Sequence, residues 1–301
     1  MKKIISKTIL LIFLILVSTI IILSTLGIET NKFNNFISKK INQTNNNINL
    51  RLTTIKFKFD IKEISLFLET NNPFLEYRGA IIPTKNIKVY IDFVSLIKTE
   101  TKIKKINLVF NTLNIEQLKK ISASFKPSNF TSFIKNKIKK GEINTELEVY
   151  LGDENSLNNF IARGSILNLD AEITKNIKIK KTNFNFFADK SDILIKNIYG
   201  EAGPFKIENG DLKAKLSSEI LIESNFKTYL KYNSRSKNYG NFIKDLRFAQ
   251  SINTVEAELN NSFFINFDQT YKIKRYSYKS NGKIIKANLK LNKSLGDFFL
   301  N

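Results

Sequence analysis

Hydrophobic and polar residues alternate with a period of two over much of the chain, which is the pattern of β-strands with one dry face. The clearest example runs from Glu142 to Leu151, where Ile143, Leu147 and Val149 are separated by polar or charged residues. The same alternation recurs at residues 55–59, 88–93, 211–216 and 286–292. Such alternation favours an antiparallel sheet with one solvated face over a parallel sheet buried on both faces.

Helical spacing of apolar residues is confined to a few short segments. It occurs at residues 32–42, 114–122 and 129–140, and more weakly at 239–249. We expect the helix at 32–42 to lie against the membrane exit of the apolar segment that precedes it, and the two short helices at 114–122 and 129–140 to cap or plug the sheet. The polar stretch around residues 232–240 predicts a mobile loop and a boundary between sub-regions.

One segment near the N-terminus is apolar without alternation. From Thr8 to Ile28 no residue is ionisable, and these 21 residues reach about 30 Å as a helix, enough to span a bilayer core. The lysines before it and Glu29 after it place the N-terminus in the cytoplasm. A cleaved signal peptide is the alternative, since small residues occur around Gly27. Either interpretation predicts that residues 29–301 form one exported β-rich domain after a hydrophobic segment at residues 1–28.

The composition is strongly basic. Lys and Arg number 48 against 27 Asp and Glu, a net charge of +21, which suggests anionic partners. Export argues against nucleic acid and leaves acidic lipid headgroups, whose attraction is worth about 1 kcal/mol per basic residue near the surface. Heavy use of Ile, Lys, Asn and Phe offers a second explanation, because an A/T-rich genome produces the same bias.

Two absences narrow the chemistry. The chain has no Cys and no His, so disulfides, thiol or Ser-His nucleophiles and the common zinc sites are excluded. Its acidic residues in the central region occupy alternating or turn positions typical of a solvated face; they are Glu142, Glu146, Glu148, Asp189 and Asp192. We therefore expect no enzymatic activity, no cofactor and no metal. Short Gly-x-apolar segments, such as those at Gly141, Gly164 and Gly210, recur at a spacing that fits a turn plus two strands, which suggests a β-meander extended by hairpins.

The order of segments resembles that of a known family. After the hydrophobic segment and a short helix come the strand-like segments 48–52, 55–59, 86–93 and 104–110, and a repetitive part follows at residues 141–223. This arrangement is similar to that of the AsmA-like family, the group that includes AsmA, YhdP and TamB. The resemblance implies a protein anchored in the inner membrane, with a long twisted antiparallel β-sheet groove in the periplasm. It further implies a function in phospholipid transfer and outer-membrane lipid homeostasis.

If the resemblance holds, phospholipid acyl chains lie on the apolar face, with the inner membrane and other envelope proteins as further partners. The residues that we expect to line such a groove are Ile55, Phe57, Val89, Ile91, Ile143, Leu147, Val149, Ile193, Ile195, Leu212 and Leu216. An ordinary β-sandwich explains the same alternation, with these residues in a closed core. The protein would then be a non-transporting envelope scaffold or assembly factor.

Overall fold

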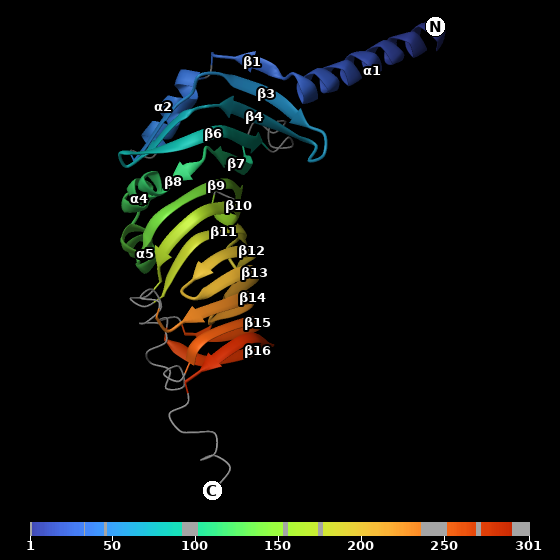
Figure 1. Cartoon of the computed structure of the whole chain (residues 1–301). Coiled ribbons are helices and arrows are strands. Elements are labelled where there is room, and N and C mark those ends of the chain that lie inside the picture. The colour runs from blue at the N-terminus through green and yellow to red at the C-terminus, as the bar shows by residue number, and fades with distance from the viewer. Residues whose placement is uncertain are drawn as a thin grey trace, which may run out of the picture. The chain divides into compact units, whose positions relative to one another are not determined.

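The fold is mainly β, as predicted, and consists of one antiparallel, twisted sheet of 16 strands with few helices (Figure 1). The computed structural model describes residues 2–32, 34–44, 47–91, 102–152, 156–173, 177–235, 252–268 and 272–290. The helices are α1 (Lys2–Thr25), α2 (Asn34–Thr44), α4 (Ile115–Ala123) and α5 (Asn129–Lys137). The strands are β1 (Ile28–Thr30), β2 (Ile48–Arg51), β3 (Ile55–Asp60), β4 (Ser65–Asn71), β5 (Phe74–Tyr77), β6 (Ala80–Ile91), β7 (Ile103–Phe110), β8 (Leu113–Asn114), β9 (Ile138–Leu151), β10 (Leu157–Glu172), β11 (Lys178–Ala188), β12 (Asp192–Ala202), β13 (Phe205–Leu216), β14 (Ile220–Asn233), β15 (Ile252–Phe267) and β16 (Ile273–Leu289).

The N-terminal hydrophobic segment is helical, with bounds that differ from the prediction. Among the described residues it is the one helix long and apolar enough to cross a membrane, over Ile4–Thr25. It ends at Thr25 rather than Ile28 because Gly27 takes a left-handed φ of 72° and its amide donates to the Ile22 carbonyl. Ile28 already belongs to β1, so only Leu26 and Gly27 separate the helix from the sheet.

The short helices lie close to where the apolar spacing predicts them. α4 begins with a capping box between Asn114 and Gln117, and α5 with one between Ser128 and Thr131. The predicted helix at residues 129–140 is too long, because α5 ends at Lys137 and the extended backbone of Ile138 starts β9. The predicted helix at 239–249 lies outside the described residues, as does most of the predicted loop at 232–240.

The chain forms two compact units. Unit 1 comprises residues 1–112 and 145–161, and unit 2 comprises residues 113–144 and 162–301. In unit 1 the strand order is β1-β3-β4-β6-β7, followed by the second half of β9. A side ladder departs from a simple meander here, because β5 pairs with β2 and with the first half of β6. In unit 2 the strands β10 to β16 each pair with the next one along the chain.

The glycines of the Gly-x-apolar segments lie inside strands. Gly141, Gly164 and Gly210 belong to β9, β10 and β13. At Gly210 the backbone is closely packed, because an added Cβ would collide with the Phe226 ring on β14. The missing side chain therefore makes room for a cross-strand aromatic ring.

Three strands of unit 2 carry irregular residues with left-handed backbone, namely Asn168, Lys181 and Asn197. Each lies where the pairing of β10, β11 or β12 with its neighbours is interrupted or shifts. The free amide of each is taken up by a side chain on an adjacent strand: Asn168 donates to Asn183, Lys181 to Asp170 and Asn197 to Asp211, at 2.8, 2.8 and 3.3 Å. These bulges are thus fixed by side-chain acceptors rather than by the ladder.

Candidate functional site

In unit 1 the register places apolar side chains in a continuous row across the sheet. Directly paired residues in an antiparallel sheet share a face. The row runs through five hydrogen-bonded strands and consists of Phe57, Leu68, Val89, Ile106 and Val149. It covers four inter-strand spacings, or about 19 Å. A parallel row contains Ile87, Leu108 and Leu147.

Most of this face is half-buried rather than sealed. Phe57, Val89 and Val149 all keep partial exposure, and so do Leu68 and Ile106. All described strands belong to one sheet, so no second described sheet is stacked on the apolar face. Of the helices, α2 packs chiefly on β2 and α4 on α5. In the described part of the chain, the Phe57 row is therefore open, unlike the inner face of a sandwich, whereas Ile55 and Ile87 on the same face are buried.

Unit 2 carries a wider apolar face of the same kind. Three rows each cross seven strands, from β10 to β16, and span six inter-strand spacings, or about 29 Å. The first row is Ala162, Ala188, Ile193, Ala214, Ile222, Ile265 and Tyr276; the second is Gly164, Phe186, Ile195, Leu212, Ser224, Phe263 and Tyr278; the third is Ala171, Ile179, Ala202, Phe205, Leu230, Ala257 and Ile284.

Burial varies across this face. The fully buried members of the rows are small, namely Ala171, Ala214, Ala257 and Ser224, whereas the large side chains remain half-buried or exposed. Beside the rows, the large side chains of Leu169, Ile198 and Tyr232 are buried on the same face. The face is therefore closed at these positions, and the large side chains of the rows leave apolar surface accessible.

The rows contain seven of the eleven predicted lining residues, four in unit 1 and three in unit 2. Ile91 lies outside the rows, opposite Leu66 of β4. Leu216 lies at the end of β13, opposite Ile220. Ile55 is only 2% exposed and belongs to the core beside β1, while Ile143 pairs with Leu113 of β8 near α4. The rows also contain residues that were not predicted, including Leu68, Ile106, Phe186 and Ile265. The alternation of apolar and polar residues within their own strands could have predicted these residues.

The opposite face of unit 1 holds a buried cationic cluster. The Lys105 ammonium is almost fully buried, lies 4.2 Å from the centre of the Tyr90 ring and pairs with the Glu63 carboxylate. Burial, followed by the negative charges of Asp60 and Glu63, raises the pKa of Tyr90. The buried Lys105 charge is thus paired with a carboxylate and lies against an aromatic ring.

A second ionic group on that face surrounds Glu69. Its carboxylate pairs with Lys58 at 2.8 Å and accepts a hydrogen bond from Asn86 at 3.0 Å. Burial by itself raises the pKa of Glu69, but these hydrogen bonds and the charges of Lys58 and Lys88 outweigh it and hold the pKa below its ordinary value. This face of unit 1 thus carries paired charges, partly buried, where the other face is apolar.

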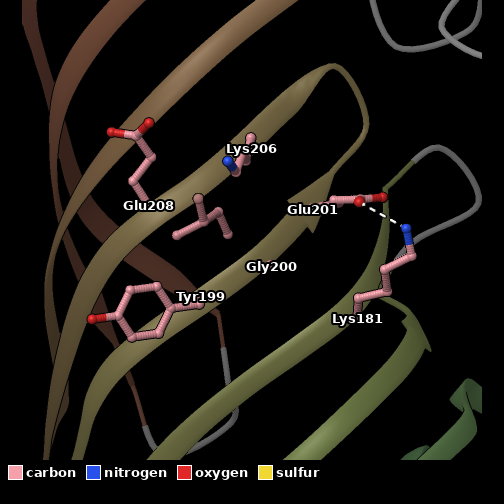
Figure 2. A pocket seen from close by; sticks show the side chains of 7 residues that line it. Lys181, Tyr199, Gly200, Glu201, Lys206 and Glu208 are labelled. Atoms are coloured by element: carbon pink, nitrogen blue, oxygen red, sulfur yellow. Dashed lines mark hydrogen bonds and ion pairs between the residues drawn. The ribbon is translucent and has the colours of Figure 1, made fainter.

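On the polar face of unit 2 there is a shallow hollow of about 350 Å³ beside the bulges (Figure 2). Tyr199, Glu201, Lys206 and Glu208 are among its lining residues, and Lys181 pairs with Glu201 at 3.1 Å. Both members of that pair are largely exposed. The hollow therefore offers solvated charges of both signs and no enclosed site.

The described residues contain no group of three or more Asp and Glu side chains that could hold a metal ion. No family model, curated protein or solved structure matches the chain. The open apolar face in each unit is therefore the feature on which a functional proposal can be based.

Proposed function

We propose that this protein is a membrane-anchored lipid carrier of the AsmA-like type, in which acyl chains lie on the open apolar faces of the sheet. The observation that carries the proposal is the set of mainly apolar rows, most of whose large side chains stay half-exposed with no second described sheet over them. Burying an acyl chain there is worth about 0.8 kcal/mol per CH₂ group, so no catalytic residue is needed.

The position of α1 supports the same proposal. If α1 spans the inner membrane with its N-terminus in the cytoplasm, the two-residue connection to β1 places the first strand of the sheet at the periplasmic membrane surface. Lipid could then pass from the bilayer to the apolar face of unit 1 without crossing a long linker. A cleaved signal peptide would remove this connection and weaken the proposal.

Site-specific photo-crosslinking tests the proposal on one strand. Ile195 and Leu194 are consecutive, half-buried residues of β12 that face opposite sides, since Ile195 pairs with Leu212 and Leu194 with Lys213. A photoreactive amino acid at position 195 in the full chain, irradiated in membranes, should yield phospholipid adducts detectable by mass spectrometry. The same amino acid at position 194 is the matched control and should yield none.

Equal adduct formation at the two positions, or none at either, would contradict the lipid-carrier proposal. Equal formation would mean non-specific contact with detergent or membrane, because the two side chains differ chiefly in the face they occupy.

One observation favours the second function, a non-transporting envelope scaffold. β16 has β15 as its sole neighbour among the described strands, and all its residues are exposed. An edge strand of this length can pair with a strand of another protein. If crosslinking at position 195 yields no lipid while a photoreactive residue at Lys279 captures a protein, the scaffold function is the better account.

A further inference from the structure

The turn between β3 and β4 exposes two isoleucines. Ile61 is 60% exposed and Ile64 is 74% exposed, at the tip formed by residues 61–64. Ile64 also takes a left-handed backbone conformation with φ of 47°. A β-branched side chain is strained there, whereas Gly or Asn would be accommodated. Two apolar side chains are therefore presented to the outside at a position whose backbone favours a small polar residue.

The register places this tip at the end of unit 1 from which α1 departs. β1 and β3 are antiparallel, with Ile28 opposite Phe57 and Thr30 opposite Ile55. In this register, the residues that precede Ile28 lie beside the residues that follow Phe57, so the C-terminal end of α1 lies near Asp60 at the end of β3. Gly27 confirms the proximity, because an added Cβ would lie 2.8 Å from Cγ of Lys58. The tip begins at Ile61, the residue that follows Asp60, and so lies next to the end of α1.

The tip is held in place from the sheet side. The Asp60 carboxylate accepts hydrogen bonds from the amides of Lys62 and Glu63 at 3.0 and 3.2 Å. The Glu63 carboxylate pairs with the buried ammonium of Lys105, which in turn lies against the Tyr90 ring. The two isoleucines are therefore fixed in an exposed position rather than folded back on the sheet.

We propose that the tip at residues 61–64 is a second membrane contact, in which Ile61 and Ile64 insert into the interface of the bilayer that α1 spans. This inference rests on the proposed membrane anchoring by α1. A lipid bilayer is the occupant that fits, because the tip adjoins the helix exit, where Leu26 is also 73% exposed. Lys62, between the two isoleucines, can extend to the headgroups. Contact at α1 and at the tip would fix the orientation of the sheet at the membrane.

The absence of cysteine allows a direct test with single-cysteine variants of the full chain. Ile61→Cys and Ile64→Cys, labelled with an environment-sensitive fluorophore, are reconstituted into phosphatidylethanolamine–phosphatidylglycerol vesicles. We expect a blue-shifted emission that is lost when part of the lipid carries a nitroxide quencher. Without labelling, both cysteines should react more slowly with a water-soluble maleimide in vesicles than after solubilisation.

Ile81→Cys is the matched control. Ile81 is 59% exposed, but it lies at the other end of the strands, because Ile91 is the β6 residue opposite Leu66 at the tip end. Ten residues of strand separate the two levels, about 33 Å. Its label should report water and remain unquenched. A label on Leu14→Cys reports whether α1 is in the bilayer.

Quenching at positions 14, 61 and 64 but not at 81 would support the inference. Quenching at 14 alone would overturn it and leave the anchoring by α1 intact. Quenching at none of the four positions would overturn both, and equal quenching at 61, 64 and 81 would show non-specific adsorption of the body instead of a contact at the tip.

Discussion

At the scale of single residues, the positive-φ positions show two uses of the left-handed backbone. Asn168 and Asn197 occupy bulges, and Asn72 lies in the short connection between β4 and β5, where a compact polar side chain relieves the strain. Ile64 is the exception, because it is β-branched and exposed. Local stability therefore does not explain Ile64, which is consistent with a function for its apolar side chain.

Replacing Ile64 by Asn should stabilise the fold. A residue that tolerates the left-handed region should raise the free energy of unfolding by about 1 kcal/mol, or the midpoint of thermal unfolding by roughly 2–4 °C. The measurement is unfolding of the full chain in detergent, followed by circular dichroism. Ile61→Asn in the same turn is the control and should give no gain, since Ile61 does not share the positive φ. A loss of stability in Ile64→Asn would refute the strain argument.

The sequence pattern predicted individual lining residues where alternation is unbroken. Phe57, Val89 and Val149 lie in one row because their strands are regular at these positions, so that alternate residues share a face and paired residues on neighbouring strands lie opposite one another. The sequence pattern did not predict the bulges at Asn168 and Lys181, because one extra residue in a strand leaves the local composition unchanged. After such a residue, the following side chains lie on the opposite face from the one that simple alternation predicts.

At the scale of elements, each strand presents different chemistry on its two faces. In β14 the alternate residues Ile222 and Leu230 belong to the apolar rows, whereas Glu223 and Lys231 face the solvated side. The strand type followed from this alternation. The exact helix ends did not, because the end of α1 depends on the tertiary pairing of β1 with β3, and the end of α5 on the start of β9.

Aspartate substitutions on the open face should be tolerated by the fold. In Leu147→Asp/Val149→Asp, each carboxylate can reach water, so we expect a loss of about 1–2 kcal/mol of unfolding free energy per site together with loss of bound lipid. Ile55→Asp is the contrast, because its side chain is 2% exposed and an unpaired charge there should prevent folding. Circular dichroism and lipid mass spectrometry of the purified variants provide the measurements. Unfolding of the double variant would indicate that the face is closed.

At the scale of the whole molecule, the chain order and the strand order nearly coincide. From β9 to β16 consecutive strands pair with one another, and from β11 onwards the principal contacts lie between consecutive strands. The antiparallel meander was predictable for this reason, since consecutive strands joined by short turns pair by default. The β2–β5 side ladder was not, because it depends on β6 pairing with different strands along its two halves.

Removal of the last two described strands should leave the others folded. A chain that stops after Arg235 loses β15 and β16, so β14 becomes the edge, and no other principal contact is broken. We expect circular dichroism per residue close to that of the full chain, and protease resistance of β10 to β14. If protease digests the shortened chain completely under conditions in which the full chain resists, the prediction is wrong and the strands of the sheet unfold cooperatively as a whole.

The nearest-neighbour pairing also makes length an adjustable property of this architecture. Stability in such a sheet is approximately a sum over adjacent strands, as in linear repeat proteins. Insertion or deletion of one hairpin would therefore change the reach of the apolar face in steps of about 9.6 Å, twice the inter-strand spacing, without redesign of the remaining strands. A sheet built in this way can be lengthened by duplication of a hairpin, so the extent of its apolar face can change without change to the fold of each strand pair.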